Sequence, residues 1–298
     1  MRSIRFKVTD SLSVHHPAIW KLLRSPVSSS ICMPKRFLAA SNELVAITII
    51  VCWAITLAYD RHLILDHPAR QIVGHFNPCF GWDYPPASYI GVMTAGLDVY
   101  LALRYANLES IRTQLLAKEG QRRWSEQFAI VTAYMHGAAA VLWLLLWTIG
   151  PPDDGMFSSW IARWVAHLSI FAVCVVCRYL CTLGNYLESR FGDASQRKRV
   201  QRRHTVFICI YGITTLILPI LYYTDVLIYS VQGRTGLDPP LPWWILQLMD
   251  AVWMICLNLS NFFTVPEPPI QMIRKILLFN EVYCVEEKDE LFHEIELG

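Results

Sequence analysis

The chain has 298 residues, of which 54% are hydrophobic and only 17% are charged, and its mean hydropathy is +0.34. A soluble domain usually carries roughly a quarter charged residues, so this composition argues against a soluble protein. The formal net charge of +2 lacks the strong positive excess that binding to nucleic acid requires. We therefore expect an integral membrane protein, with no nucleic acid among its partners.

Six apolar stretches are long enough to cross a bilayer as helices, which takes about 20 residues because the hydrocarbon core is about 30 Å thick. They lie at about residues 44–59, 87–106, 127–149, 160–186, 205–229 and 243–265. Pro85 and Pro86 suit a helix start before the second stretch, and Pro219 predicts a kink in the fifth. The sequence thus predicts an all-α, polytopic bundle of six transmembrane helices over residues 43–265.

Basic residues gather in alternate connections between these stretches. The second and fourth connections hold Arg112, Lys118, Arg122, Arg123, Arg190, Arg197, Lys198, Arg199, Arg202 and Arg203. The tail before the first stretch is basic as well, whereas the other three connections are poor in lysine and arginine. By the positive-inside rule, we expect the two basic connections and both termini to face the cytosol.

The two ends of the chain differ in charge. Residues 1–42 form a basic, serine-rich tail, and residues 266–298 form an acidic tail. The basic tail has the composition of an organellar transit segment, but it also suits a cytosolic tail beside an anionic leaflet; we favour the cytosolic tail and leave the alternative open. The acidic tail is expected to be solvated and partly disordered.

Ionisable side chains at membrane depth are costly, so each one is a candidate for function or for pairing with a neighbouring helix. Counted at 1.5 Å per residue, Asp98 lies about 16 Å and His136 about 20 Å below the outer surface. Because their helices are joined by a short connection and should be antiparallel neighbours, we expect Asp98 and His136 to meet.

A second candidate pair lies nearer the outer surface. His167 and Asp250 are each about 12 Å deep on the same count, so their depths match. Arg178 lies deep in the fourth stretch, toward the cytosolic side, and its side chain is expected to snorkel to the headgroups. Together with Asp98 and His136, these residues are the candidates for a polar interior that binds lipid or a partner.

Catalytic signatures are absent from the sequence, including the G-x-S-x-G, H-E-x-x-H and phosphate-loop patterns. Two intramembrane histidines could ligate a haem, but the depths of His136 and His167 differ by about 8 Å. Cys174, Cys177 and Cys181 share one helix face, and we interpret them as packing residues, because a zinc site needs a fourth ligand. We therefore predict no catalytic residue, no metal ligand and no cofactor.

Three segments and their order resemble the family of damage-regulated autophagy modulators and its DRAM/Frag/Sfk-like relatives. These segments read DYPPASYIGVMTAGLDVYLALRYANLESI, VAHLSIFAVCVVCRYL and QLMDAVWMICLNLSNFFTV. The resemblance covers roughly residues 44–265. It implies that His167 stands at the intramembrane histidine of the family, and that Asp250 stands where the family tends to have glutamate.

The resemblance implies a non-catalytic membrane protein of lipid handling, endomembrane trafficking or autophagy regulation, which acts by binding membrane lipids or other membrane proteins. Its expected location is the lysosome, the Golgi or the plasma membrane, and the basic N-terminus leaves the mitochondrial inner membrane open. Two alternatives belong to other classes. One is an accessory subunit of a large, mitochondrial membrane complex, and the other is a lipid-remodelling enzyme or proton-coupled transporter that uses the intramembrane Asp and His side chains.

Overall fold

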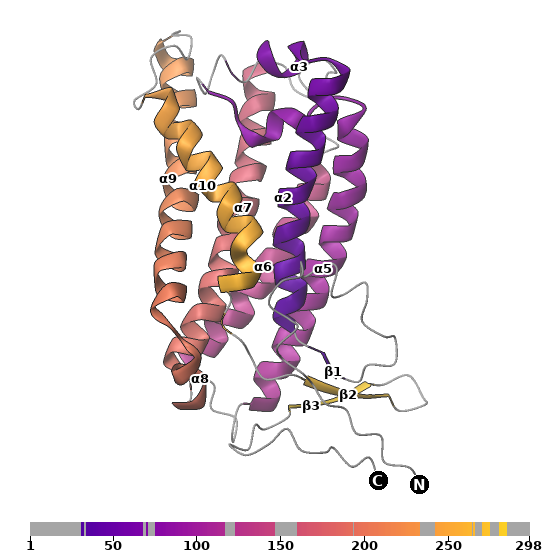
Figure 1. Ribbon diagram of the computed structural model, residues 1–298, viewed down its shortest axis with the longest axis vertical. Helices are drawn as coiled ribbons and strands as arrows, with labels where there is room; N and C mark the ends of the chain where they lie inside the picture. The colour runs from indigo at the N-terminus through magenta and orange to yellow at the C-terminus, as the bar shows by residue number, and fades with distance from the viewer. Residues whose placement is uncertain are drawn as a thin grey trace.

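The computed structural model describes residues 31–32, 34–67, 70, 75–116, 123–146, 160–192, 194–232, 242–263, 265, 270–274 and 280–284. Within these residues, long helices dominate the molecule (Figure 1). They are α2 (Pro34–Tyr59), α5 (Ala87–Leu116), α6 (Trp124–Leu146), α7 (Trp160–Phe191), α9 (Arg202–Gln232) and α10 (Trp243–Phe263). The helical bundle predicted from the sequence is confirmed.

Three helices in the described part of the chain are long and apolar enough to cross a membrane, judged by length and composition. These segments are Pro34–Tyr59, Trp124–Leu145 and Ser169–Phe191, and Trp244–Ser260 is a shorter apolar helix. Helix α2 begins at Pro34 rather than near Leu44. Proline suits the first turn of a helix, and neither glycine nor a second proline interrupts α2 before its end at Tyr59.

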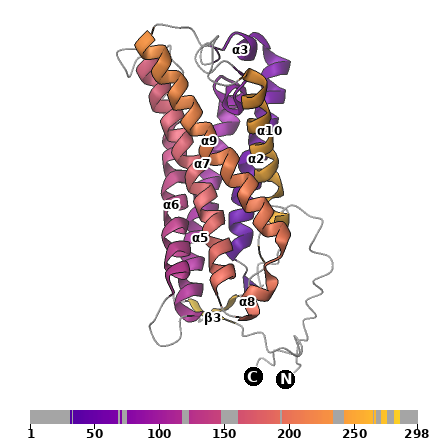
Figure 2. The same ribbon diagram turned by 90° about the vertical axis from the view of Figure 1, so that its left-hand side faces the viewer.

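The long helices form a ring in which each one packs against the next along the chain (Figures 1 and 2). Helix α2 packs against α5, α5 against α6, α6 against α7, α7 against α9 and α9 against α10, and α10 closes the ring on α2. The contact between α6 and α7 is the most extensive. There a Cβ added at Gly184 would lie 2.5 Å from Thr132 Oγ1 and 3.1 Å from Ala129 Cα, so glycine allows the two backbones to approach closely.

The first outer connection folds into a cap over one end of the bundle. It contains α3 (His62–Leu65) and the short 3-10 helix η2 (Pro78–Trp82), whose five residues are all buried. Trp53 Nε1 donates to the carbonyl oxygen of Pro78 at 2.7 Å, and Thr56 Oγ1 donates to that of Gly81 at 2.6 Å. Two side chains of α2 therefore hold η2 in place.

A small antiparallel sheet lies at the opposite end of the bundle (Figure 1). Its strand order is β1 (Ile31–Cys32), β2 (Ile270–Arg274) and β3 (Asn280–Cys284), with Cys32 opposite Ile270 and Ile270 opposite Cys284. The sequence analysis did not predict this sheet, because each strand is short and its partner lies far away in the sequence or within the acidic tail. Isoleucine, valine and tyrosine in these segments favour strands once partners are present.

The helices enclose an apolar core, but their outer surface departs from the pattern found in soluble proteins. Large apolar side chains are exposed on every long helix. They include Ile50 on α2, Met93 on α5, Val131 on α6, Val173 on α7, Ile220 on α9 and Leu248 on α10. Asp98, Glu109, Arg112 and Arg178 are at most 3% exposed. The helices thus turn apolar side chains outward and enclose charged ones.

Candidate functional site

A cluster of polar side chains from four helices lies inside the bundle, and we call it the central polar cluster. Its members are Ser41 and Asn42 on α2, Asp98 on α5, His136 on α6 and Arg178 on α7. Arg178 is 3% exposed and the other four residues are fully buried. Because each helix contributes one or two members, the cluster can only form when all four helices are packed together.

Arg178 is the centre of the hydrogen-bond pattern in this cluster. Its Nη2 donates to the carboxylate of Asp98, and its Nη1 donates to Ser41 Oγ at 2.8 Å and to Asn42 Oδ1 at 3.1 Å. Ser41 Oγ in turn donates to Asp98 Oδ1 at 2.5 Å. A charge-assisted pair that is further bonded by neutral groups is the arrangement in which buried charges are tolerated.

His136 joins the cluster through Ser41, with His136 Nε2 lying 3.2 Å from Ser41 Oγ. A serine hydroxyl has a single proton, and Ser41 directs that proton to Asp98. His136 is therefore assigned as the neutral tautomer that carries its proton on Nε2 and donates it to Ser41. The charges of Asp98 and Arg178 then cancel, and the cluster as a whole is uncharged.

The structure brings Asp98 and His136 together, as their depths and the helix hairpin indicated, with Ser41 between them. The expected position of Arg178 was wrong. It does not reach toward the headgroups; it is buried and paired with Asp98. The reason is that Asp98 on α5 offers a carboxylate at the depth of Arg178. The Arg178 guanidinium is paired with this carboxylate and does not have to reach water for hydrogen bonds.

A second group, the outer polar cluster, lies beneath the cap and consists of His67, His75, Asp83, His167 and Asp250. His75 Nε2 lies 2.9 Å from Asp250 Oδ2. Asp83 lies between two histidines, with His67 Nε2 at 3.1 Å and His167 Nε2 at 3.6 Å. The expected pairing of His167 with Asp250 thus gives way to contacts of each residue with the cap.

Cys79, in η2, belongs to the same buried region. Burial raises the pKa of the Cys79 thiol well above its usual value, and the nearby carboxylates of Asp83 and Asp250 raise it further. The thiol is therefore protonated and unreactive at neutral pH, since the thiolate is the nucleophile.

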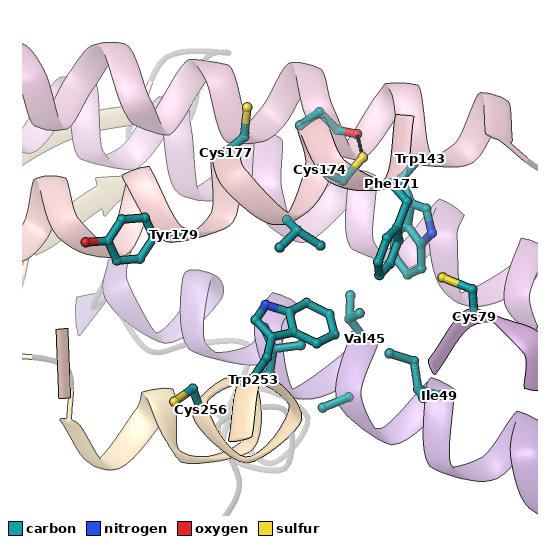
Figure 3. Close-up of a cluster of buried hydrophobic side chains, with 14 of the residues drawn as sticks. Val45, Ile49, Cys79, Trp143, Phe171, Cys174, Cys177, Tyr179, Trp253 and Cys256 are labelled. Atoms are coloured by element: carbon teal, nitrogen blue, oxygen red, sulfur yellow. Dashed lines mark hydrogen bonds between the residues drawn. The ribbon is translucent and has the colours of Figure 1, made fainter. Parts of the chain in front are cut away.

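Aromatic rings separate the outer polar cluster from the central one. Trp82 of the cap lies 5.7 Å from Trp143 and 6.5 Å from Phe171, measured between ring centroids, and Phe171 lies 5.8 Å from Trp253. The guanidinium of Arg178 lies 5.6 Å from the centroid of the Trp143 ring. Figure 3 shows Trp143 and Phe171 side by side, with Trp253 facing them from the opposite wall. This layer shields the central polar cluster from the cap side.

A third charged group lies at the other end of the bundle and joins α5 to α7. Arg112 Nε donates to Glu109 Oε2 at 3.0 Å, and Arg112 Nη2 donates to Glu188 Oε1 at 2.6 Å. The sequence analysis placed Arg112 in a basic connection, but α5 continues to Leu116 and buries it. Burial alone would raise the pKa of Glu109, yet the charge and hydrogen bonds of Arg112 outweigh burial and hold that pKa below its usual value.

The contacts of these groups hold the helices and the cap together. Among the described residues, no group of three His, Cys, Asp or Glu side chains is placed to hold a metal ion. Ser41 and His136 are within reach of each other, as a nucleophile and its base would be. However, Ser41 directs its proton to Asp98, so the hydroxyl is not oriented toward His136 for proton transfer.

Sequence reasoning missed Ser41 and Asn42, and it left His75 and Asp83 in a loop without placing them against the helices. Ser41 and Asn42 fell in the expected tail, although the uninterrupted helical run from Pro34 could have extended the first helix to include them. His75 and Asp83 lie in a connection, and the sequence of a connection has no periodic apolar pattern that would show its packing against the bundle. Comparison with known proteins adds no further guide, because no family model, no curated protein and no solved structure matches this chain.

Proposed function

We propose that this chain is an integral membrane protein of six spans that binds lipid, without catalysing a reaction, in lipid handling or endomembrane trafficking. The observation that carries the proposal is the apolar outer surface of the bundle together with its buried charged pairs. Every long helix exposes large apolar side chains, while the Asp98–Arg178 and Glu109–Arg112 pairs are enclosed. In water this arrangement would expose a belt of apolar surface, whereas in a bilayer the belt faces lipid.

The same observation supports our proposal of six spans, beyond the three helices that qualify by length and composition. Helices α5 and α9 carry exposed apolar residues such as Met93, Leu97, Ile213 and Ile220. They pack in the same ring as α2, α6 and α7. A helix that lay outside the bilayer would gain nothing from such a surface.

A binding role agrees with the charge balance of the interior. A proton-coupled transporter needs a carboxylate that can gain and lose a proton, but Asp98 is already paired with Arg178 and bonded by Ser41. The resemblance to the damage-regulated autophagy modulators supports the same role, and we propose membership of that family on the segments quoted above. We propose an endomembrane location on the same ground.

The number of spans is tested by the sidedness of Arg123, between α5 and α6. With six spans Arg123 faces the cytosol, opposite to Asp66 of the outer connection. If only α2, α6 and α7 crossed, both residues would lie on the outer side. Arg123→Cys and Asp66→Cys are labelled with a membrane-impermeant maleimide on intact and on opened vesicles, with the unmodified chain as the blank. Labelling of both variants from the same side would contradict six spans.

Lipid binding is tested on the protein purified in mild detergent. Lipids extracted from it are quantified by mass spectrometry and compared with the lipids of the source membrane. The proposal expects one lipid class to be enriched at a roughly constant ratio to protein through successive washes. Lipid that follows the bulk composition and washes away steadily would overturn the binding role.

A further inference from the structure

Several buried polar atoms, His136 Nδ1 among them, have no hydrogen-bond partner among the residues that the structure describes. We consider three donors among these atoms, one from each of three helices. They are Asn42 Nδ2 on α2, Tyr211 OH on α9 and Trp253 Nε1 on α10, and we call them the donor cluster. Asn42 and Tyr211 are fully buried and Trp253 is 2% exposed. Burying such groups without a partner is unfavourable, and native proteins rarely do so without a bound molecule to satisfy them.

The donor cluster belongs to one region of the bundle. Helix α10 packs against both α2 and α9. Asn42 is bonded to Arg178 at 3.1 Å, and Tyr211 lies within electrostatic range of the same guanidinium. The rings of Tyr211 and Tyr179 are 5.4 Å apart. Figure 3 shows the indole nitrogen of Trp253 turned away from Phe171, toward the side on which Tyr179 lies.

The chemistry of the unused groups specifies what could satisfy them. An amide NH₂ and an indole N–H can only donate, and a tyrosine hydroxyl can donate as well. A molecule that bonds to all three must therefore offer oxygen acceptors. Arg178 is already neutralised by Asp98, so the region offers no net positive charge to a phosphate or a carboxylate, and a buried unpaired anion would be strongly disfavoured.

From these contacts we infer that the donor cluster binds the carbonyl oxygens of an uncharged acyl lipid, that is, the ester groups of a diacylglycerol or the amide of a ceramide. This inference rests on the proposed function, in that it names the site and the class of the bound lipid. The apolar side chains around the cluster, including Phe207 and Leu257, suit the acyl chains that accompany such carbonyl groups.

The test measures the thermal stabilisation of the purified full chain in detergent by increasing mole fractions of dioleoylglycerol. Ceramide is the second probe, since it separates amide from ester binding. Phosphatidic acid is the anionic comparison, and hexadecane supplies acyl-like chains without carbonyl oxygens. We expect dioleoylglycerol or ceramide to stabilise the protein in a saturable manner, and we expect phosphatidic acid and hexadecane to give no saturable response.

Two variants remove single donors, namely Tyr211→Phe, which keeps the ring shape, and Trp253→Phe, which keeps an aromatic ring of smaller size. Each should weaken the apparent affinity for the responding lipid by about fivefold to tenfold, the loss of one hydrogen bond. Without lipid, Tyr211→Phe should be at least as stable as the parent chain, because an unpartnered polar group has been removed, whereas Trp253→Phe also loses buried packing and should be less stable. The matched controls are Tyr134→Phe and Trp124→Phe, whose side chains are 46% and 57% exposed, and these should leave the affinity unchanged.

Several results would overturn the inference. Unchanged affinity in both donor variants would place the lipid elsewhere, and tighter binding of phosphatidic acid would contradict an uncharged ligand. No saturable response to either acyl lipid would overturn the inference, whatever the heat stability of the variants. If a different lipid class is nevertheless enriched in the purified protein, the proposed function stands and only this site fails.

Discussion

Arg178 on α7 donates to the carboxylate of Asp98 on α5, and the two side chains are 4% and 0% exposed. The two helices are not consecutive, since α6 lies between them along the chain. The pair thus spans the ring and ties one wall of the bundle to another. The pair stabilises the packing of the helices only while both charges are present, because either one alone would be buried without a counterion.

Replacing Asp98 by leucine should destabilise the protein by about 3–5 kcal/mol, the usual cost of leaving one buried charge unpaired. Thermal unfolding in detergent measures the effect. The double variant Asp98→Leu with Arg178→Met should be markedly more stable than Asp98→Leu alone. Leu97→Ala is the control, since Leu97 is 44% exposed on the same helix. Equal melting temperatures for Asp98→Leu and the control would contradict the role of the pair.

Gly81 in the cap should not tolerate alanine. An added Cβ would lie 2.2 Å from Trp53 Cδ1 and 2.8 Å from Trp53 Cα, and the backbone atom cannot move aside without shifting α2. We expect Gly81→Ala to destabilise the protein by about 1–3 kcal/mol, the range of overpacked sites. Gly96→Ala is the matched control, because nothing lies within 4 Å of its added Cβ. Gly96→Ala should raise the free energy of unfolding by about 1 kcal/mol, because alanine favours the helix over glycine. A neutral Gly81→Ala would show that η2 does not lie against α2.

The contact of His75 with Asp250 should govern access to Cys79. His75→Leu removes the buried side-chain contact between the cap and Asp250 of α10 and leaves the two hydrogen bonds between Gln247 and the backbone of Phe76. The loss should expose the buried thiol and bring its pKa down toward the usual value. The rate of alkylation of Cys79 at pH 8, followed by mass spectrometry, should rise at least severalfold. His62→Leu is the control, because His62 contacts Asp66 on the surface, with side chains 64% and 75% exposed. An unchanged rate in His75→Leu would mean that other contacts hold the cap.

Glu109 should contribute an acid-sensitive part of the stability. Its pKa in the folded protein lies below its usual value because Arg112 outweighs the effect of burial. A lowered folded-state pKa stabilises the protein above the unfolded pKa of about 4.3. This contribution is lost as the pH falls through the folded-state value. Melting temperatures between pH 7 and pH 3.5 should therefore fall less in Glu109→Gln, which starts lower at pH 7, than in the parent chain. Asp66→Asn, at an exposed site, should follow the parent curve.

Part of the candidate site could be predicted because it follows from depth and connectivity. Asp98 and His136 lie on helices joined by a short connection, and antiparallel neighbours bring residues of similar depth together. The same comparison of depths gave the wrong partner for Asp250, because it considered only residues within the predicted helices. His75 lies in the connection between α2 and α5. The position of that connection against the bundle depends on tertiary packing, such as the close contact of Gly81 with Trp53.

The sequence by itself determined that the chain forms long apolar helices, where most of them lie, and that Asp98, His136 and Asp250 are buried among them. These properties depend on local composition, and they can be read from the apolar stretches and the basic connections between them. Tertiary structure alone decided that Arg178 turns inward to Asp98, that Arg112 is enclosed by Glu109 and Glu188, and that β1 pairs with β2. Each of these contacts joins residues far apart in the sequence. Their partners are set by how the helices pack around the ring, and no local pattern encodes that packing.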